Sequence, residues 1–182
     1  EEILVKGIRF NLQNDGYEVI TGVNGLDAVT IAGSQKVDLI ILDVMMPEMD
    51  GCELCNAIKG DIELSHIPVL LLTAAVGVET NLRSLQAGAD AYIEKPFKME
   101  ILSAQINNLF KNREIRNRQF ATSPLSHINC SSINKVEYEF VNSLHSYILD
   151  HISEPELSIT RLANEMSMSK ASLSRKVKAN TG

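Results

Sequence analysis

The chain has 182 residues, of which 45% are hydrophobic and 22% charged, and its formal net charge is -6. This composition is typical of a soluble globular protein and excludes a disordered or fibrous class. The longest nearly apolar run, residues 67–78, is shorter than the roughly 20 residues of a membrane span, and the opening Glu1-Glu2 lacks the pattern of a signal peptide. We therefore expect a cytoplasmic chain without membrane contact.

Apolar residues in the first part of the chain predict alternating helices and strands. The spacing predicts an amphipathic helix over 1–14 that ends at Gly16. The elements expected after it are a short strand at 17–21, a helix at 24–32, a strand at 37–42, a helix at 52–59, a strand at 67–72, a helix at 79–87 and a strand at 91–93. The continuous Val, Ile and Leu runs are typical of strands covered on both faces, so we predict an α/β fold with a doubly wound parallel sheet.

The second part of the chain predicts helices only. A long helix begins at Lys98 and ends near Phe120, and the Ser- and Asn-rich residues after it have no periodicity, which indicates a linker. Apolar residues every four positions from Val136 predict another helix, and two shorter helices follow Pro155. The predicted domains are a first domain at 1–120, a linker at 121–134 and a smaller all-α domain at 135–182.

Three strand ends bring a carboxylate, a hydroxyl and a cation to one edge of the predicted sheet. Asp43 ends a buried strand and is followed by a turn with Pro47 and Gly51. Thr73 ends the next strand, and Lys95 ends the last. Ligands of α/β sheets bind at this edge, where a carboxylate can act as nucleophile while Lys95 and a divalent cation offset phosphoryl charge. We therefore predict phosphoryl transfer to Asp43.

On these residues, positions 3–120 resemble a response-regulator receiver domain, a flavodoxin-like fold in which an aspartate accepts phosphate from a histidine kinase. The resemblance implies that Asp43 is the phosphoacceptor and that Thr73 hydrogen-bonds the phosphoryl group. It also implies that Lys95 is the salt-bridge partner and that Tyr92 is an aromatic switch.

The resemblance further implies a magnesium ion, with Asp43 and the main-chain carbonyl of Met45 among its ligands. The family holds Mg²⁺ with an acidic pair at the end of its first strand, whereas this chain opens with Glu1-Glu2 at a helix start. We expect the first strand and its pair to lie upstream of residue 1; the alternative is that Glu1 and Glu2 are that pair. The expectation is weak or absent Mg²⁺ binding and poor phosphate acceptance.

The C-terminal part is basic and predicts a DNA-binding unit. Residues 169–182 contain Lys170, Arg175, Lys176 and Lys178 and no acid. Two short helices, 159–166 and 170–179, each follow a serine suited to an N-cap, and the short segment between them predicts a helix-turn-helix. Small and cationic residues outward on the second helix suit a DNA groove and its phosphates.

This part resembles the AraC-type DNA-binding domain, and the whole order resembles the receiver and effector end of a hybrid two-component sensor. By position, Ala171, Ser174 and Arg175 match base-facing sites, whereas Ser169, Lys170 and Lys178 match phosphate contacts. The family often has Gly where Ser167 stands, and it has two helix-turn-helix units, so a chain that ends after the first should bind DNA weakly.

The sequence therefore predicts a two-component response regulator and not an enzyme. A histidine kinase or kinase domain phosphorylates Asp43, which controls homodimer formation and sequence-specific DNA binding in the cytoplasm or on the cytoplasmic part of a membrane-anchored hybrid sensor. The alternative is a phosphorelay or protein-interaction module whose C-terminal helices bind protein. A phosphatase is disfavoured because Met45 stands where a second acid is needed.

The cysteines give a minor alternative. Cys52, Cys55 and Cys130 are an odd number without metal-site partners, which favours reduced thiols. Cys52 and Cys55 have the spacing of a redox pair, but they lie on a predicted helix without the usual surroundings of such a pair.

Overall fold

The computed structural model describes residues 2–46, 50–74, 86–122, 135–154 and 156–181. The chain divides into two compact units. Unit 1 contains residues 1–56 and 68–111, and unit 2 contains residues 57–67 and 112–182. The segment 57–67 thus belongs to the same unit as the C-terminal helices, which no sequence pattern indicated.

Unit 1 alternates helices and strands. Its elements are α1 (Glu2–Asn14), α2 (Gly25–Ser34), β1 (Ile40–Asp43), α3 (Gly51–Gly60), β2 (Val69–Ala74), β3 (Ala91–Lys95) and α5 (Met99–Thr122), of which α3 and α5 continue into unit 2. In the described residues the sheet consists of three parallel strands in the order β1-β2-β3, in which Ile40 pairs with Val69 and Leu70 with Ala91. This is the predicted parallel α/β architecture.

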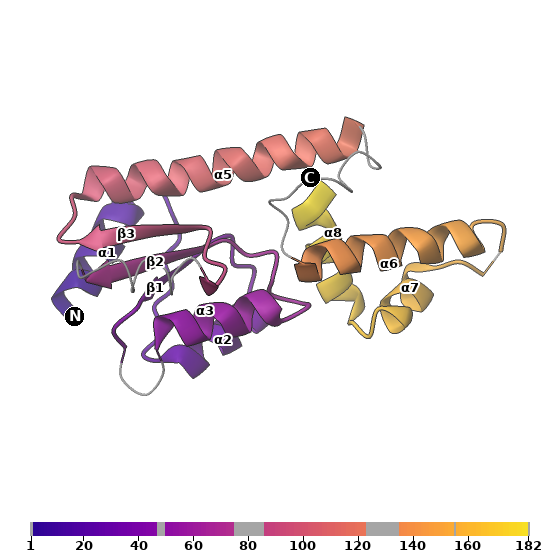
Figure 1. Cartoon of the computed structure of the whole chain (residues 1–182), viewed down its shortest axis with the longest axis horizontal. Helices are drawn as coiled ribbons and strands as arrows, with labels where there is room; N and C mark the ends of the chain where they lie inside the picture. The colour runs from indigo at the N-terminus through magenta and orange to yellow at the C-terminus, as the bar shows by residue number, and fades with distance from the viewer. Residues whose placement is uncertain (1, 47–49, 75–85, 123–134, 155, 182) are drawn as a thin grey trace. The chain divides into compact units, whose positions relative to one another are not determined.

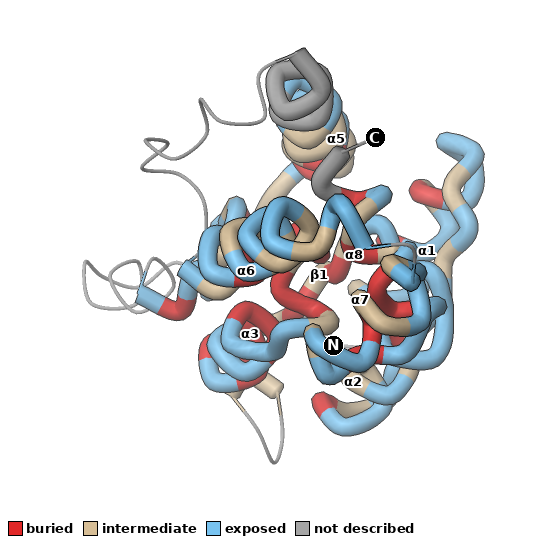
Figure 2. The backbone as a smooth tube through the Cα atoms, turned by 90° about the vertical axis from the view of Figure 1, so that its right-hand side faces the viewer, coloured by how far each residue is buried: buried red, intermediate tan, exposed pale blue. Residues whose placement is uncertain are grey.

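Helices cover both faces of this sheet, with α1 and α5 on one face and α2 and α3 on the other (Figure 1). The core on the first face consists of Ile8 and Leu12 from α1, Leu70 and Leu72 from β2, Ile93 from β3, and Leu102 and Ile106 from α5. Successive strand residues face opposite sides of a sheet, so covering both sides buries the whole run from Val69 to Thr73. Buried residues accordingly gather in the sheet and along one side of α3 (Figure 2).

Two predicted strands differ from the structure. Residues 17–21 form no strand, because no described strand beside them supplies hydrogen bonds; Tyr17 and Val19 instead pack against the core. β1 begins at Ile40 and not at Val37, because its pairing with β2 starts there. Most of the helix expected at 79–87 lies outside the described residues.

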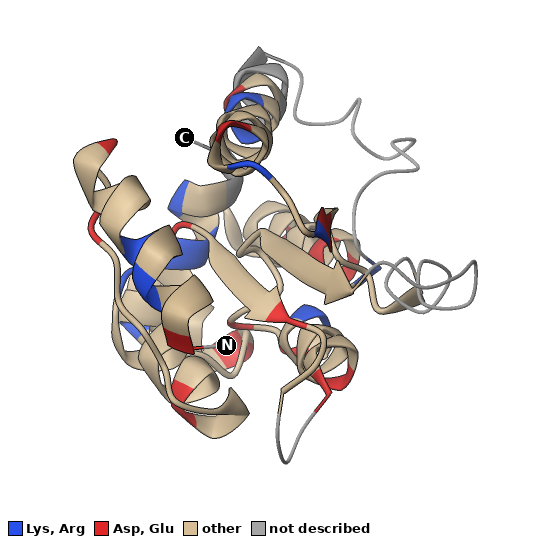
Figure 3. Ribbon diagram, turned by 90° about the vertical axis from the view of Figure 1, so that its left-hand side faces the viewer, with Lys and Arg blue, Asp and Glu red and all other residues tan. Residues whose placement is uncertain are grey.

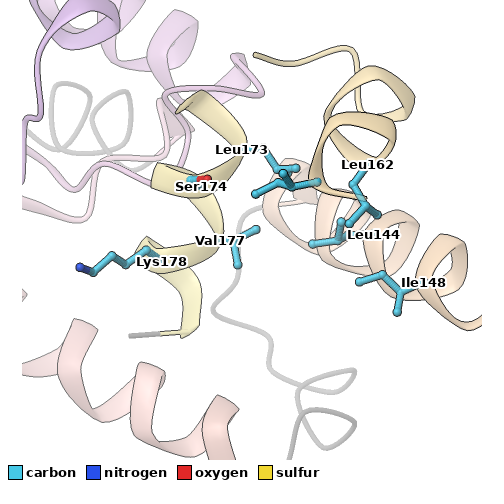
Figure 4. A pocket seen from close by; sticks show the side chains of 8 residues that line it. Leu144, Ile148, Leu162, Leu173, Ser174, Val177 and Lys178 are labelled. Atoms are coloured by element: carbon cyan, nitrogen blue, oxygen red, sulfur yellow. The ribbon is translucent and has the colours of Figure 1, made fainter. Parts of the chain in front are cut away.

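Unit 2 contains the helices α6 (Lys135–His151), α7 (Ile159–Glu165) and α8 (Lys170–Thr181), close to the predicted ranges. Their buried core consists of Phe140, Ala163, Met168 and Leu173, with Val141, Leu144, Leu162, Met166 and Val177 packed against it. Figure 4 shows Leu173 and Val177 of α8 directed toward α6 and α7, beside a cavity of about 390 Å³. Phe140 and Leu144, which belong to the apolar series from Val136, lie in or against this core, whereas Ile159 of α7 is 50% exposed.

A tight turn joins α7 to α8. Ser167 has a φ of 54°, in the left-handed region that disfavours a side chain. Its N–H donates to the Asn164 carbonyl at 3.0 Å, and the Met168 N–H donates to the Ala163 carbonyl at 2.8 Å. These two bonds form a Schellman motif, which normally has glycine at the position of Ser167.

Serine hydroxyls cap both helices, as predicted. The side chain of Ser158 accepts a hydrogen bond from the Arg161 N–H, and Ser169 Oγ accepts one from the Ser172 N–H at 3.0 Å. These caps satisfy backbone donors that have no partner within the first helical turn.

Candidate functional site

The charged residues of the strands lie at the carboxyl edge of the sheet. β1 ends with Asp43 and β3 ends with Glu94 and Lys95, whereas β2 carries no charge. Figure 3 shows the strands uncharged except at their ends. A charge farther along a strand that is covered on both faces would lose its water, so the ends are where the fold tolerates ionised groups.

Asp43 and Lys95 form an ion pair at this edge. Lys95 Nζ donates a hydrogen bond to Asp43 Oδ2, and the two side chains retain 23% and 18% exposure respectively. Asp43 Oδ1 accepts a hydrogen bond from the Met45 N–H at 3.1 Å. Both carboxylate oxygens are therefore oriented while the pair stays accessible to a small reactant. The Lys95–Pro96 peptide bond is cis.

Gly51 lets α3 begin directly against the end of β1. A Cβ at this position would lie 2.2 Å from the Asp43 carbonyl oxygen and 3.0 Å from the Val44 Cα. The Gly51 N–H donates to the Val44 carbonyl at 3.1 Å, and Asp50 Oδ1 accepts from the Cys52 N–H at 2.8 Å. The sequence placed Gly51 only in a turn, whereas the structure shows that its missing side chain is what makes this contact possible. Pro47 lies outside the described residues.

Thr73 and Tyr92, two of the other predicted site residues, lie on neighbouring strands without an observed bond to the ion pair, whereas Met45 bonds to Asp43 through its main-chain N–H. Thr73 is buried in β2, where its hydroxyl donates to the Ala74 carbonyl at 3.2 Å. Tyr92 on β3 is 41% exposed, and Met45 after β1 is also exposed. Their roles in phosphoryl binding, switching and metal binding stay predictions.

The described residues do not fit a resident Mg²⁺ on their own. The described part of the chain contains no group of three or more acidic, histidine or cysteine side chains that could hold a metal ion. Glu2 is an exposed acid in the first turn of α1, paired with Lys6 at 2.8 Å, and Glu1 lies outside the described residues. Because Mg²⁺ needs several oxygen ligands, Asp43 alone, already facing Lys95, is a poor donor set.

On α8, most of the predicted DNA-contacting residues are exposed. The exposed ones are Ser169, Lys170, Ala171, Ser174 and Lys178, and Arg175 is half-buried. In Figure 4 the Lys178 side chain extends away from the apolar core. The four cations of residues 169–182 are not equivalent, however, because Lys176 is completely buried. Sequence reasoning missed this burial and the partner of Lys176 on α6, Glu137.

The cysteine alternative gains no support from the structure. Cys52 and Cys55 are both buried in α3, and the Cys55 thiol contacts the Ala87 carbonyl at 3.4 Å. A redox pair must meet a partner at the surface, which buried thiols cannot do. Cys130 lies outside the described residues.

Unit 1 is thus a flavodoxin-like α/β domain with an aspartate and a lysine joined at the carboxyl edge of its sheet. Comparison with known families agrees with this class. The model of the response regulator receiver domain matches residues 1–107. The receiver domain of a signal transduction histidine kinase from Syntrophus aciditrophicus superposes with a TM-score of 0.58 at 38% identity, covering 62% of this chain and 85% of that chain.

Two curated proteins show the same likeness. The chain is 34% identical over 171 residues to Histidine kinase P4 of Formosa agariphila, covering 93% of this chain and 12% of that protein. It is 36% identical over 115 residues to the alkaline phosphatase synthesis transcriptional regulatory protein PhoP of Bacillus subtilis, covering 63% of this chain and 47% of PhoP. The chain thus spans about an eighth of the length of Histidine kinase P4 and about half of the length of PhoP.

The chain belongs to the response regulator receiver family. Receiver domains are signalling modules that take phosphate from histidine kinases, and they generally bind Mg²⁺ at an acidic pocket. Within the described parts of the chain, no helix has the length and apolar character needed to cross a membrane.

Proposed function

We propose that Asp43 accepts a phosphoryl group from a histidine kinase or kinase domain. The observation that carries this proposal is the Lys95–Asp43 ion pair at the carboxyl edge of the sheet, in a chain of the receiver family. A carboxylate at this position is accessible and held by hydrogen bonds to both oxygens. These are the properties that a nucleophile for phosphoryl transfer needs.

The transfer itself is a single displacement at phosphorus. An Asp43 oxygen forms the new P–O bond, the P–N bond of the donor phosphohistidine breaks, and the leaving imidazole nitrogen keeps the bonding electron pair. The Lys95 ammonium then offsets part of the added negative charge. Thr73 would have to turn its hydroxyl from the Ala74 carbonyl toward a phosphoryl oxygen. We expect Tyr92, the proposed aromatic switch, to change its position when Asp43 is phosphorylated.

Acetyl phosphate tests the acceptor, because it donates without a kinase. With excess donor and Mg²⁺, we expect slow labelling of the chain, measured as the mass of one phosphoryl group, and no labelling of Asp43→Asn. Slow labelling is expected because the described residues supply a poor magnesium site. Equal labelling of Asp43→Asn, or no labelling of the parent chain at saturating donor, would contradict the proposal.

We further propose that the C-terminal helices bind DNA in the AraC manner, with α8 as the recognition helix. Ala171, Ser174 and Arg175 would face bases, and Ser169, Lys170 and Lys178 would contact phosphates. The support is that Leu173 and Val177 point into the core, which leaves Ala171, Ser174 and Lys178 exposed together. An exposed face with small residues and cations suits a major groove.

The proposed regulator is a cytoplasmic, non-catalytic protein with a domain at 1–120, a linker at 121–134 and a DNA-binding part at 135–182. Phosphorylation at Asp43 would favour a homodimer whose two α8 helices engage two half-sites. The similarity to Histidine kinase P4, which covers 93% of this chain, also suits the receiver and effector end of a hybrid sensor.

Titration with duplex DNA at several salt concentrations separates this function from a protein-binding module. Each phosphate neutralised by a lysine or arginine contributes about -0.9 to the slope of log affinity against log salt, so Lys170 and Lys178 together predict a slope of about -2. Binding without salt dependence, or no binding in either phosphorylation state, would favour the phosphorelay or protein-interaction alternative.

A further inference from the structure

Helix α8 has three faces with different surroundings. Successive residues of a helix turn by roughly 100°, so Leu173 and Val177 share one face and Ser174 and Lys178 a second. The first of these faces packs in the core of unit 2, and the second is exposed. Lys176 lies on the third face, with no exposed surface. A cation in the middle of a proposed recognition helix is thus unavailable to DNA.

The Lys176 ammonium is enclosed by groups of unit 2. It forms an ion pair with Glu137 at the start of α6 and donates to Ser65 Oγ at 2.9 Å. Ser65 in turn donates to Glu137 at 2.6 Å, and the ammonium lies 4.8 Å from the centroid of the Phe140 ring. Glu137 and Phe140 are three residues apart and therefore lie on the same side of α6.

Because the Glu137–Lys176 ion pair is buried, it restricts how α8 can be rotated about its axis. Apolar contacts such as those of Leu173 and Val177 allow a helix to rotate with modest loss, because any apolar neighbour can replace another. A buried ammonium has no water to replace its partner, so it needs the Glu137 carboxylate at one place. Burial lowers the pKa of Lys176, and the neighbouring Glu137 opposes that shift. The pair is therefore compatible with only one rotation of α8.

We propose that the Glu137–Lys176 pair fixes the rotation of α8 on α6, so that Lys176 is a positioning residue of the reading helix and not a DNA contact. The effect of this positioning on DNA affinity rests on the proposed DNA-binding function. The positioning itself is a property of the free protein and can be measured without DNA.

Hydrogen exchange of the full chain tests the positioning. Glu137→Gln removes the carboxylate that the Lys176 ammonium contacts, and we expect amide exchange in α8 to accelerate at least about tenfold. Lys178→Ala, on the exposed face of the same helix, is the matched control and should leave α8 exchange unchanged. Equal protection of α8 in Glu137→Gln and the parent chain would overturn the proposal.

A double variant guards against simple unfolding. Glu137→Leu with Lys176→Met replaces the pair by apolar groups of similar volume, a change that buried pairs often tolerate without loss of stability. We expect a thermal midpoint close to that of the parent chain but affinity for a random-sequence duplex reduced about tenfold, with the salt slope unchanged. Lys178→Ala should instead reduce the salt slope by about one.

The outcomes separate this inference from the proposed function. Parent-like DNA affinity of the folded double variant, or a reduced salt slope in it, would show that Lys176 does not position α8 or that it contacts phosphate, and either result overturns the inference. If the parent chain shows no salt-dependent binding, the proposed DNA function fails, while the exchange of α8 in Glu137→Gln still decides whether the pair positions the helix.

Discussion

Replacing Gly51 by alanine tests whether close packing of α3 against β1 holds the Asp43 site in place. The added Cβ would lie 2.2 Å from the Asp43 carbonyl oxygen and 2.9 Å from its carbonyl carbon. Both atoms belong to the backbone, so no side-chain rotation relieves the contact. Either α3 or the end of β1 must move, and both changes displace the carboxylate that Lys95 holds.

Two opposing effects set the magnitude. Overpacking costs about 1–3 kcal/mol, and a clash with backbone belongs at the upper end of that range. Alanine also favours a helix over glycine by about 0.5–1 kcal/mol. We therefore expect Gly51→Ala to lower the free energy of unfolding by about 2 kcal/mol and to slow phosphorylation at Asp43.

Gly60 provides a control on the same helix. A Cβ on Gly60 has no atom within 4 Å, so Gly60→Ala should leave stability unchanged or raise it by up to about 1 kcal/mol. Urea denaturation followed by helical circular dichroism measures both variants against the parent chain. If Gly51→Ala were as stable as Gly60→Ala, the observed contact would not constrain the start of α3, and the reasoning would be refuted.

Three further predictions concern the turn, a half-buried histidine and the metal. Ser167→Gly should raise the free energy of unfolding by about 1 kcal/mol in urea titrations, because Ser167 has a φ of 54° that glycine adopts freely. Burial and the neighbouring Lys176 lower the pKa of His66 to about 4. Its folded state thus binds fewer protons than the unfolded state, and stability should fall by about 3 kcal/mol between pH 7 and pH 4, with a flatter profile for His66→Gln. Calorimetric titration with Mg²⁺ should show no saturation at low millimolar concentration, because the described residues contain no group of three or more side chains that could hold the ion; tight binding would contradict this.

Periodicity predicted much of the fold because it records which side of each element is buried. The spacing of Ile8 and Leu12 gave the inner side of α1, and the spacing from Phe140 gave that of α6. Strand pairing is not encoded in this way, since it depends on a neighbour distant in sequence. Residues 17–21 therefore read as a strand but form none, and β1 begins where its partner Val69 begins.

The candidate site was predictable to the extent that parallel strands end at one edge. Because of that rule, Asp43 and Lys95 were expected to meet although 52 residues separate them, and they form an ion pair. The hydroxyl of Thr73 was expected at the same place, but its direction depends on local hydrogen bonds, and it donates to Ala74. The burial of Lys176 could not be predicted from the sequence, because it lies in a basic segment with Arg175 and Lys178 and its partner Glu137 is 39 residues away.

The chain pairs a lysine with a carboxylate in two different settings, and the exposure of each pair decides what it does. At the rim of the sheet, Lys95 and Asp43 keep contact with water, so losing one partner costs little and the carboxylate can accept new charge. In unit 2, Lys176 and Glu137 have almost no contact with water. Losing one partner therefore leaves a buried charge, which lowers the free energy of unfolding by about 3–5 kcal/mol. A pair that tolerates a change of charge suits a chemical switch, whereas a pair that cannot tolerate it suits the fixing of a helix. Substituting each lysine by methionine should therefore impair phosphorylation in one case and stability in the other.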